Sequence, residues 1–317
     1  MRFTITHHTE QGWNEVRLTD TQRGTIASII PSAGALLNGF SVERFRIRTN
    51  IIDGYKHAED WRARVETGFQ SAKLSPFVCR LRNSTYQWLG EELRVDKFSI
   101  NGSAIHGILY DASFDVIEEK IQNDHAELEL RYSYTGDIPG YPFPYDCFIR
   151  YRLLADDSLV VTTAIHNRSK TPIPVADGWH PYFTLGGKVD DLMLQFHAKG
   201  QMEYDAALLP TGRILETNAW SSPRKIGDSD LDDGFLLDFG YAQPLCTLSN
   251  PATGMSVSFH PDPSYPYLQL YIPPHRRSIA IENLSAAPDA FNNGMGLISL
   301  EADHTRTFSV RLAIGCE

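Results

Sequence analysis

Short segments rich in β-branched and aromatic residues, each followed by Gly, Pro, Asn or Asp, recur along the chain. Two pairs of segments read as hairpins: residues 113–122 and 125–134 flank Asn123-Asp124, and residues 145–154 and 159–167 flank residues 155–158. Further candidate strands lie at residues 24–30, 86–89, 92–95, 192–198, 245–249, 255–260, 267–272, 278–283 and 308–314. Only residues 57–69 carry a helical pattern. This pattern of short strands and turns predicts an all-β fold, a sandwich or barrel of antiparallel sheets.

The chain has no segment that reads as a linker, because Pro and Gly are spread evenly and no Ser/Gly-rich or like-charged run interrupts it. Its 317 residues fit one large domain or two ordinary ones. We expect a single domain over residues 1–317, and two packed sandwiches that share an interface are the alternative.

The bulk composition narrows the possible partners. A net charge of −10 argues against nucleic acids and anionic membrane surfaces, which would repel the protein. No apolar run has the length of a membrane span, and the N-terminus lacks the apolar core of a signal peptide. The cysteines are widely spaced and form no CxxC pair, which argues against a zinc or redox motif and favours free thiols in the cytoplasm. They are Cys79, Cys147, Cys246 and Cys316.

The segment 177–187, Asp-Gly-Trp-His-Pro-Tyr-Phe-Thr-Leu-Gly-Gly, places His180 among three aromatic residues ahead of a Gly-Gly break. Histidine exchanges protons near physiological pH, and aromatic rings offer rigid apolar area to the C–H faces of a sugar. The segment therefore suggests acid–base chemistry on a carbohydrate. The competing interpretation is that the aromatic residues, Trp179, Tyr182 and Phe183, are core packing.

Two other positions could act with His180. In Ile105-His106-Gly107, the glycine would let a backbone or a ligand approach the histidine closely, although a solvated loop histidine would look the same. Glu282 stands between apolar residues on a predicted strand, where an unpaired carboxylate is costly. Such a glutamate is either paired with a cation or kept for function. The loop at residues 288–294 could close over one end of a site.

Arg80 is a candidate for binding hydroxyl groups or a carboxylate, and Asp232-Asp233 places two carboxylates side by side. A guanidinium can fork to two neighbouring hydroxyls, although a surface arginine is the simpler interpretation of Arg80. The two carboxylates read as part of a turn, where most such pairs are solvated.

Two histidines and one glutamate from distant strands could converge as acid, helper and base on a hemiacetal. A base would take the proton of the anomeric hydroxyl while an acid protonates the ring oxygen. A non-catalytic sugar-binding module is the alternative from another class, and a two-histidine, one-carboxylate metal site is a third. A glycosidase is disfavoured, because it would need two carboxylates that bracket one bond.

These residues and their order resemble the aldose 1-epimerase (mutarotase) family over nearly the whole chain. The most specific match is Gly178–Leu185, which is similar to the family's histidine-proline-tyrosine-phenylalanine motif. Ile105-His106-Gly107 resembles the block of the first active-site histidine, and Ile281-Glu282-Asn283 the block of the catalytic glutamate. Residues 24–35, 50–55 and 74–80 resemble further family blocks.

The resemblance implies a cofactor-free, metal-free enzyme on a large twisted antiparallel β-sandwich, with a small sugar as its partner and a monomeric or homodimeric state. By this analogy Glu282 is the general base, His180 the general acid, and His106 orients the sugar. Arg80 and Asp232 would hold hydroxyls, with Asp233 as the alternative to Asp232.

Beside these groups, we expect Trp179 and Phe183 to wall the sugar pocket. The family often has Asn-Arg-Ile where this chain reads Cys79-Arg80-Leu81. Related enzymes act on free hexoses or on hexose 6-phosphates, and a phosphate would need a cationic site. Lys73, Arg82 and Arg150 are the candidate cations for it.

Overall fold

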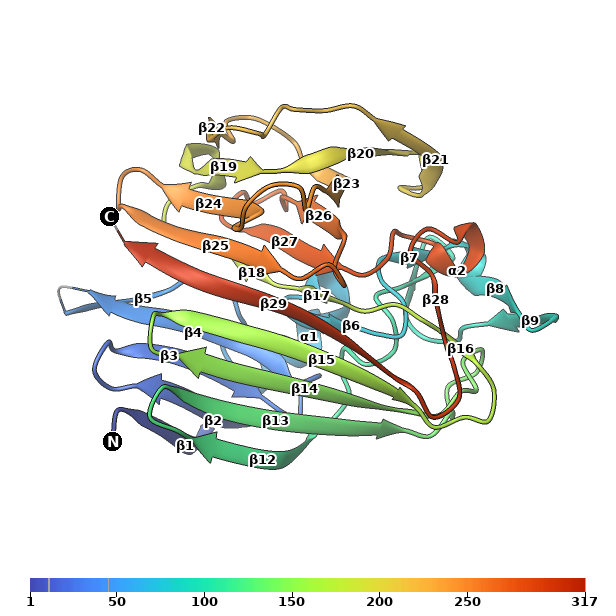
Figure 1. Ribbon diagram of the computed structural model, residues 1–317, viewed down its shortest axis with the longest axis horizontal. Helices are drawn as coiled ribbons and strands as arrows, with labels where there is room; N and C mark the ends of the chain where they lie inside the picture. Colours follow the sequence, from blue (N-terminus) through green and yellow to red (C-terminus); the bar gives the residue numbers. More distant parts are fainter. Residues whose placement is uncertain (11, 45, 317) are drawn as a thin grey trace.

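The computed structural model describes residues 1–10, 12–44 and 46–316. Its architecture is mostly β, as predicted, and the ladders between its named strands within these residues are antiparallel. The sheet with the most strands has nine, and it extends across the molecule in Figure 1. In spatial order its strands are β12 (Asp115–Ile121), β13 (His125–Tyr134), β14 (Tyr145–Leu154), β15 (Ser158–Asn167), β29 (Thr305–Cys316), β25 (Met255–Pro261), β24 (Cys246–Asn250), β19 (Met193–Phe196) and β22 (Arg224–Lys225).

Two further sheets pack against this long sheet. The five-stranded sheet consists of β1 (Phe3–Glu10), β2 (Trp13–Asp20), β3 (Thr25–Ile30), β4 (Leu36–Arg44) and β5 (Ile47–Asn50). The eight-stranded sheet has the order β21 (Pro210–Leu215), β20 (Ala198–Tyr204), β23 (Asp232–Leu237), β26 (Tyr267–Tyr271), β27 (Ile279–Leu284), β17 (Gly178–His180) and β6 (Ala72–Leu74), with β18 (Tyr182–Phe183) also paired to β27.

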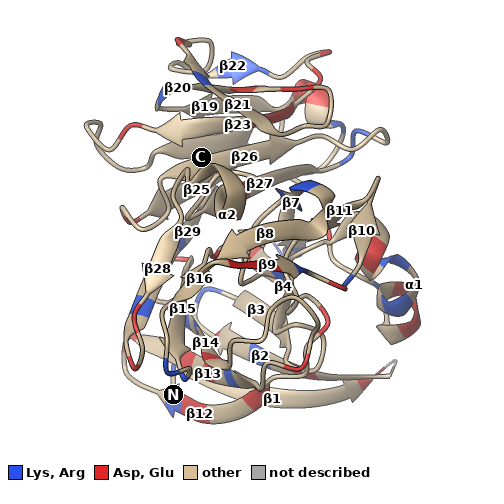
Figure 2. Cartoon of the chain, turned by 90° about the vertical axis from the view of Figure 1, so that its right-hand side faces the viewer, with Lys and Arg blue, Asp and Glu red and all other residues tan. Residues whose placement is uncertain are grey.

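Smaller elements complete the chain. They are the sheet of β10 (Ser99–Ile100), β11 (Ser103–Ile105) and β7 (Arg80–Leu81), the pairs β8 (Thr85–Trp88) with β9 (Glu91–Arg94) and β16 (Ile173–Val175) with β28 (Ile298–Leu300), the helices α1 (Ala58–Gly68) and α2 (Ala290–Asn293), and the 3₁₀ turns Arg82–Ser84 and Val189–Asp191. Figure 2 shows β7, β8, β10 and β11 in the part of the molecule between the eight-stranded and the five-stranded sheets.

Alternating side chains explain why the long strands form. Along β14 and β15 every second residue is buried, which gives each strand one face toward the core and one toward solvent. One continuous hydrophobic cluster joins the three large sheets, from Leu37 on β4 through Leu128 on β13 to Phe235 on β23. At 25 cal/mol per Å², each such fully buried side chain contributes about 2 kcal/mol.

The predicted helix at residues 57–69 is confirmed as α1, and its ends explain its bounds. His57 is the N-cap, and its Nδ1 accepts a hydrogen bond from the backbone N–H of Asp60 at 3.1 Å. Phe69 ends the helix in a left-handed conformation, with φ of 50°. This turn directs the chain into β6 and places Phe69 beside the cleft described below. No helix within the described residues is long and apolar enough to cross a membrane.

Candidate active site

A cleft of about 750 Å³, its open mouth included, lies between the eight-stranded sheet, the end of α1 and the small sheet that contains β7 and β11. Five of the predicted site residues line the cleft together: Arg80, His106, His180, Asp232 and Glu282. They come from β7, the end of β11, β17, β23 and β27, so that the fold brings together positions up to about two hundred residues apart in sequence.

Glu282 and His180 form the centre of the cleft. Glu282 Oε1 lies 3.3 Å from His180 Nε2, and the side chains are 1% and 6% exposed. The other carboxylate oxygen of Glu282 and Nδ1 of His180 are buried without a hydrogen-bond partner among the described residues. Burial raises the pKa of Glu282, with a further contribution from the charge of Asp232, and burial lowers the pKa of His180 to about 4. Both shifts favour the uncharged form of each group, a protonated carboxyl and a neutral imidazole.

His106 stands edge-on to His180, with ring centroids 4.9 Å apart, and packs on Phe69 at 4.6 Å. Burial lowers the pKa of His106, and the nearby charges of His180 and Arg80 lower it further, so its ring is neutral at physiological pH. Gly107 adopts φ of 75°, and a side chain there would collide with the backbone of Ser75. The predicted close backbone approach at this glycine is confirmed, and it fixes the loop that presents His106.

The loop at residues 288–294 supports Arg80 rather than merely covering the site. The backbone N–H of Asp289 donates to the carbonyl of Arg80 at 2.8 Å, and its carboxylate accepts from the backbone N–H of Arg82 at 2.9 Å. Pro288 lines the cleft beside them. The loop thus holds β7, and with it the guanidinium of Arg80, against the cleft.

The carboxylate pair Asp232-Asp233 begins strand β23, so the prediction of a turn here was wrong. Both residues pair with β26, and the period of two sends their side chains to opposite faces. Asp232 faces the cleft and accepts from Gln269 Nε2 at 3.0 Å, whereas Asp233 accepts from Gln201 Nε2 at 2.7 Å and does not line the cleft. Burial raises the pKa of Asp232, and the charge of Arg80 opposes that shift.

The structure places Trp179 and Phe183 away from the cleft, contrary to the expectation that they wall the sugar pocket. The indole Nε1 of Trp179 donates to the carbonyl of Ser71 at 3.0 Å, and Phe183 packs edge-on against Phe259 at 4.9 Å between the sheets. Both belong to the hydrophobic core. Trp179 is adjacent to His180 on β17, and adjacent residues of a strand face opposite sides.

Other aromatic side chains supply the wall that the sequence alone did not identify: Phe69, Tyr182, Tyr204 and Tyr271. Tyr182 stacks on His180 at 5.0 Å and stands two positions after it, so the period of two could have found it. Gln269 also lines the cleft, and its Oε1 accepts from the hydroxyl of Tyr204 at 2.8 Å. A polar residue inside the apolar run of β26 was the available signal for Gln269.

The sequence profile of the aldose 1-epimerase family matches residues 16–313. The chain belongs to the aldose 1-epimerase family. Among proteins of that fold, a galactose mutarotase-like protein from Clostridium acetobutylicum superposes with a TM-score of 0.87 at 18% identity, covering 100% of this chain and 99% of the other. Galactose 1-epimerase from Lactobacillus acidophilus gives a TM-score of 0.81 at 18% identity, with the same coverage.

An uncharacterised Escherichia coli K12 protein, YihR, is 28% identical over 236 residues, which cover 72% of this chain and 74% of that protein. The aldose 1-epimerase family is a family of isomerases that act on sugars, so membership identifies an epimerase-type enzyme.

In this aldose 1-epimerase family member, the three cations considered for a phosphate site do not converge. Lys73 is buried and paired with Asp177 at 2.6 Å, and Arg150 is paired with Glu129 at 3.0 Å on the nine-stranded sheet. Arg82 is paired with Asp205 at 3.0 Å. Across the described ranges, no group of three or more His, Cys, Asp or Glu side chains is arranged to hold a metal ion.

Proposed function

We propose that this protein is an aldose 1-epimerase that interconverts the α and β anomers of a free aldohexose, with Glu282 as general base and His180 as general acid. The observation that carries the proposal is the contact of 3.3 Å between the Glu282 carboxylate and the His180 imidazole, both buried in one cleft. A proton can be taken up and given back there without exchange with bulk water.

In the proposed reaction, the Glu282 carboxylate removes the proton of the C1 hydroxyl while the His180 imidazolium protonates the ring oxygen. The bond between C1 and the ring oxygen breaks, and the open-chain aldehyde forms. The single proton of the pair has then moved from His180 to Glu282, so no net proton is consumed. Rotation about the C1–C2 bond presents the other face of the aldehyde, and the reversed transfers close the other anomer.

The division of roles is assigned from the contact between the two groups, because their pKa shifts favour the reverse protonation in the free protein. Burial raises the pKa of Glu282 and lowers that of His180 to about 4, which favours a protonated carboxyl and a neutral imidazole, the state that the pair has after ring opening. Ring closure starts from that state, whereas ring opening starts once the proton has moved from Glu282 to His180. Burial keeps His106 neutral, so its ring would donate a hydrogen bond to the sugar, or accept one from it, without adding charge.

Arg80 and Asp232 would bind hydroxyl groups at the rim of the reacting carbon, as donor and acceptor. Asp232 is held by Gln269, which is itself held by Tyr204, so the carboxylate is oriented before the sugar arrives. The rings of Tyr182 and Tyr271, whose centroids are 6.4 Å apart, would pack on the sugar's C–H faces.

We favour an unphosphorylated hexose over a hexose 6-phosphate. Arg80 is the Lys or Arg side chain among the residues that line the cleft, and the carboxyl groups of Asp232 and Glu282 line the same cleft. The other candidate cations are each paired with a carboxylate elsewhere. A phosphate dianion would therefore enter a site of unfavourable charge.

Polarimetry on freshly dissolved α-glucose and α-galactose tests the proposed function. We expect the approach to anomeric equilibrium to be faster with the protein than in buffer, in proportion to protein concentration. The anomerisation of glucose 6-phosphate should be accelerated less than that of the free hexoses. A rate equal to the buffer rate for every sugar, together with saturable sugar binding, would favour the non-catalytic carbohydrate-binding interpretation.

A further inference from the structure

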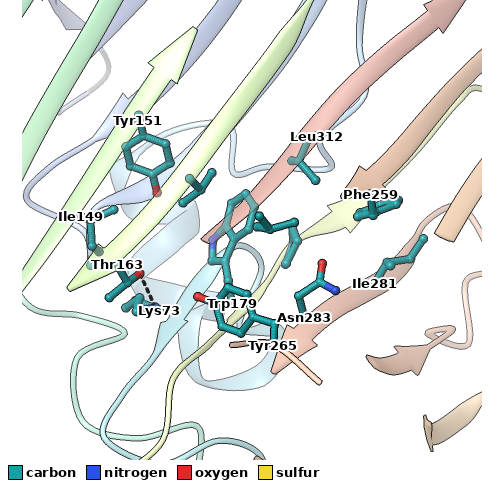
Figure 3. A pocket seen from close by; sticks show the side chains of 14 residues that line it. Lys73, Ile149, Tyr151, Thr163, Trp179, Phe259, Tyr265, Ile281, Asn283 and Leu312 are labelled. Carbon is teal, nitrogen blue, oxygen red and sulfur yellow. Dashed lines mark hydrogen bonds between the residues drawn. The ribbon is translucent and has the colours of Figure 1, made fainter. Parts of the chain in front are cut away.

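A charged cluster lies in the core directly behind the cleft, outside the residues assigned to the reaction. Lys73 on β6 and Asp177 just before β17 form an ion pair of 2.6 Å, with side chains that are 4% and 0% exposed. Figure 3 shows the cavity that Lys73 enters, between Thr163, Trp179 and Tyr265. Two charges withdrawn from water cost free energy unless further hydrogen bonds satisfy them.

Those further hydrogen bonds join three parts of the fold. Lys73 Nζ donates to Thr163 Oγ1 on the nine-stranded sheet at 2.9 Å, and to the carbonyl of Gly178 on β17 at 3.0 Å. The hydroxyl of Tyr265 donates to Asp177 at 2.6 Å. The cluster therefore ties β6, β17 and the nine-stranded sheet together.

The same cluster also reaches the strand that carries Glu282. The backbone N–H of Asp177 donates to Ser285 Oγ at 2.8 Å, and the backbone N–H of Ser285 donates back to the carbonyl of Asp177 at 2.8 Å. Ser285 follows β27 directly. Asp177 thus stands three residues before His180 and is bonded to a residue three positions after Glu282.

We propose that Lys73 and Asp177 are positioning residues for the reaction, which set the separation of His180 and Glu282 by clamping β17 to β27 and to the nine-stranded sheet. The inference rests on the proposed function for its kinetic consequence. Displacement of a reacting group by about 1 Å can cost about 100-fold in rate. Arg80 and Asp232 lie on β7 and β23, outside this clamp, so loss of the clamp lowers kcat and leaves KM nearly unchanged.

The double variant Lys73→Met/Asp177→Asn tests the proposal, because it removes both charges while it keeps the side-chain volumes close. Each single variant leaves one buried charge unpaired and loses much stability, whereas the double variant recovers most of it. We expect the folded double variant to lose about 10- to 100-fold in kcat, with KM changed less than about threefold. A double variant with the kcat of the unmodified protein would overturn the proposal.

The matched control is Arg2→Met/Asp20→Asn, which removes another ion pair with a fully buried carboxylate. The partners of Asp20 are Arg2, Gln22 and Arg23, far along the chain from β17 and β27. We expect this control to lose stability and to keep its kcat. An equal loss of kcat in the control would show that the effect is general destabilisation, and would overturn the positioning role.

Tyr265→Phe is the milder variant that decides the question if the double variant does not fold. It removes one hydrogen bond to Asp177 and leaves the ion pair in place. We expect kcat to fall by about threefold or more at unchanged KM, in line with one lost hydrogen bond to a charged group. An unchanged kcat here would contradict the clamp.

An NMR titration of the His180 imidazole separates this inference from the proposed function, because it needs no activity. If the unmodified protein accelerates no anomerisation, the proposed function fails while the titration still reports on the clamp. We expect the titration of His180 to change in the double variant and to stay the same in the control. The same His180 titration curve in the unmodified protein, the double variant and the control would refute the positioning role of Lys73 and Asp177. That result would leave the proposed function standing.

Discussion

Replacing Glu282 by glutamine should lower activity and raise stability at once. The substitution keeps the shape of a side chain that is 1% exposed and removes its charge, 3.3 Å from His180 Nε2. Loss of a positioned general base costs about 10²- to 10⁴-fold in rate. This corresponds to about 3–5 kcal/mol in the activation barrier, since each factor of ten is about 1.4 kcal/mol.

The stability effect has a sign that follows from the raised pKa of Glu282. The folded protein holds this proton more tightly than the unfolded chain, whose glutamates titrate near pH ~4.3. The contribution of Glu282 to the free energy of unfolding is therefore fully present below pH ~4.3. It falls by about 1.4 kcal/mol per pH unit between the unfolded and the folded pKa of Glu282. Glutamine has no such loss, so its advantage should grow between pH 5 and pH 8.

Urea unfolding at the two pH values and polarimetry on the same preparations measure both effects. Glu127→Gln is the matched control, because Glu127 is also buried but is paired with Arg152 at 2.6 Å on the nine-stranded sheet. It should lose stability and keep its activity. Unchanged kcat in Glu282→Gln, or lower stability than wild type at pH 8, would refute the assignment of Glu282 as a buried base.

Further variants test the other parts of the site. His180→Asn should lower kcat by about 10²- to 10⁴-fold and remove the alkaline limb of the pH–kcat profile, and a retained limb would assign the acid elsewhere. Asp232→Asn should raise KM by about 10-fold while kcat changes little, because a hydrogen bond to a charged group is worth about 1.5–3 kcal/mol; a fall in kcat alone would argue against a hydroxyl-binding role. Trp179→Phe should lower the free energy of unfolding in urea by about 1–3 kcal/mol, because the carbonyl of Ser71 loses its hydrogen-bond donor. A large rise in KM would instead indicate that Trp179 contacts the sugar. Dialysis against a chelator should leave the mutarotation rate unchanged, and activity restored by a divalent ion would support a metal site.

Much of the fold could be predicted because the long strands alternate cleanly. The two hairpins predicted at residues 113–134 and 145–167 appear as β12 with β13 and as β14 with β15. Most of the N-terminal sheet was missed, since β1 is a largely exposed edge strand whose polar residues hide the alternation. The strand β23 was missed because two adjacent carboxylates are typical of a turn. In the structure both residues pair with β26, and the side chain of Asp232 lies in the cleft.

The candidate site was predicted better in its polar residues than in its aromatic ones. Residue chemistry and the resemblance to the aldose 1-epimerase family pointed to His106, His180 and Glu282 as partners, and the fold brings them into one cleft. The aromatic walls depend on which side of a strand each ring faces, and proximity in sequence to His180 misled that choice for Trp179. A single domain over residues 1–317, a cytoplasmic location and a monomeric or homodimeric state stay predictions.

Exchange NMR on a free hexose at anomeric equilibrium tests the central claim most directly. It measures magnetisation transfer between the α and β C1 protons without any change in composition, for the unmodified protein and for Glu282→Gln and His180→Asn. We predict an exchange rate that rises in proportion to the unmodified protein and falls to nearly the buffer rate in both variants. Exchange at the buffer rate with the unmodified protein, or full exchange in both variants, would contradict acid–base catalysis by the His180–Glu282 pair.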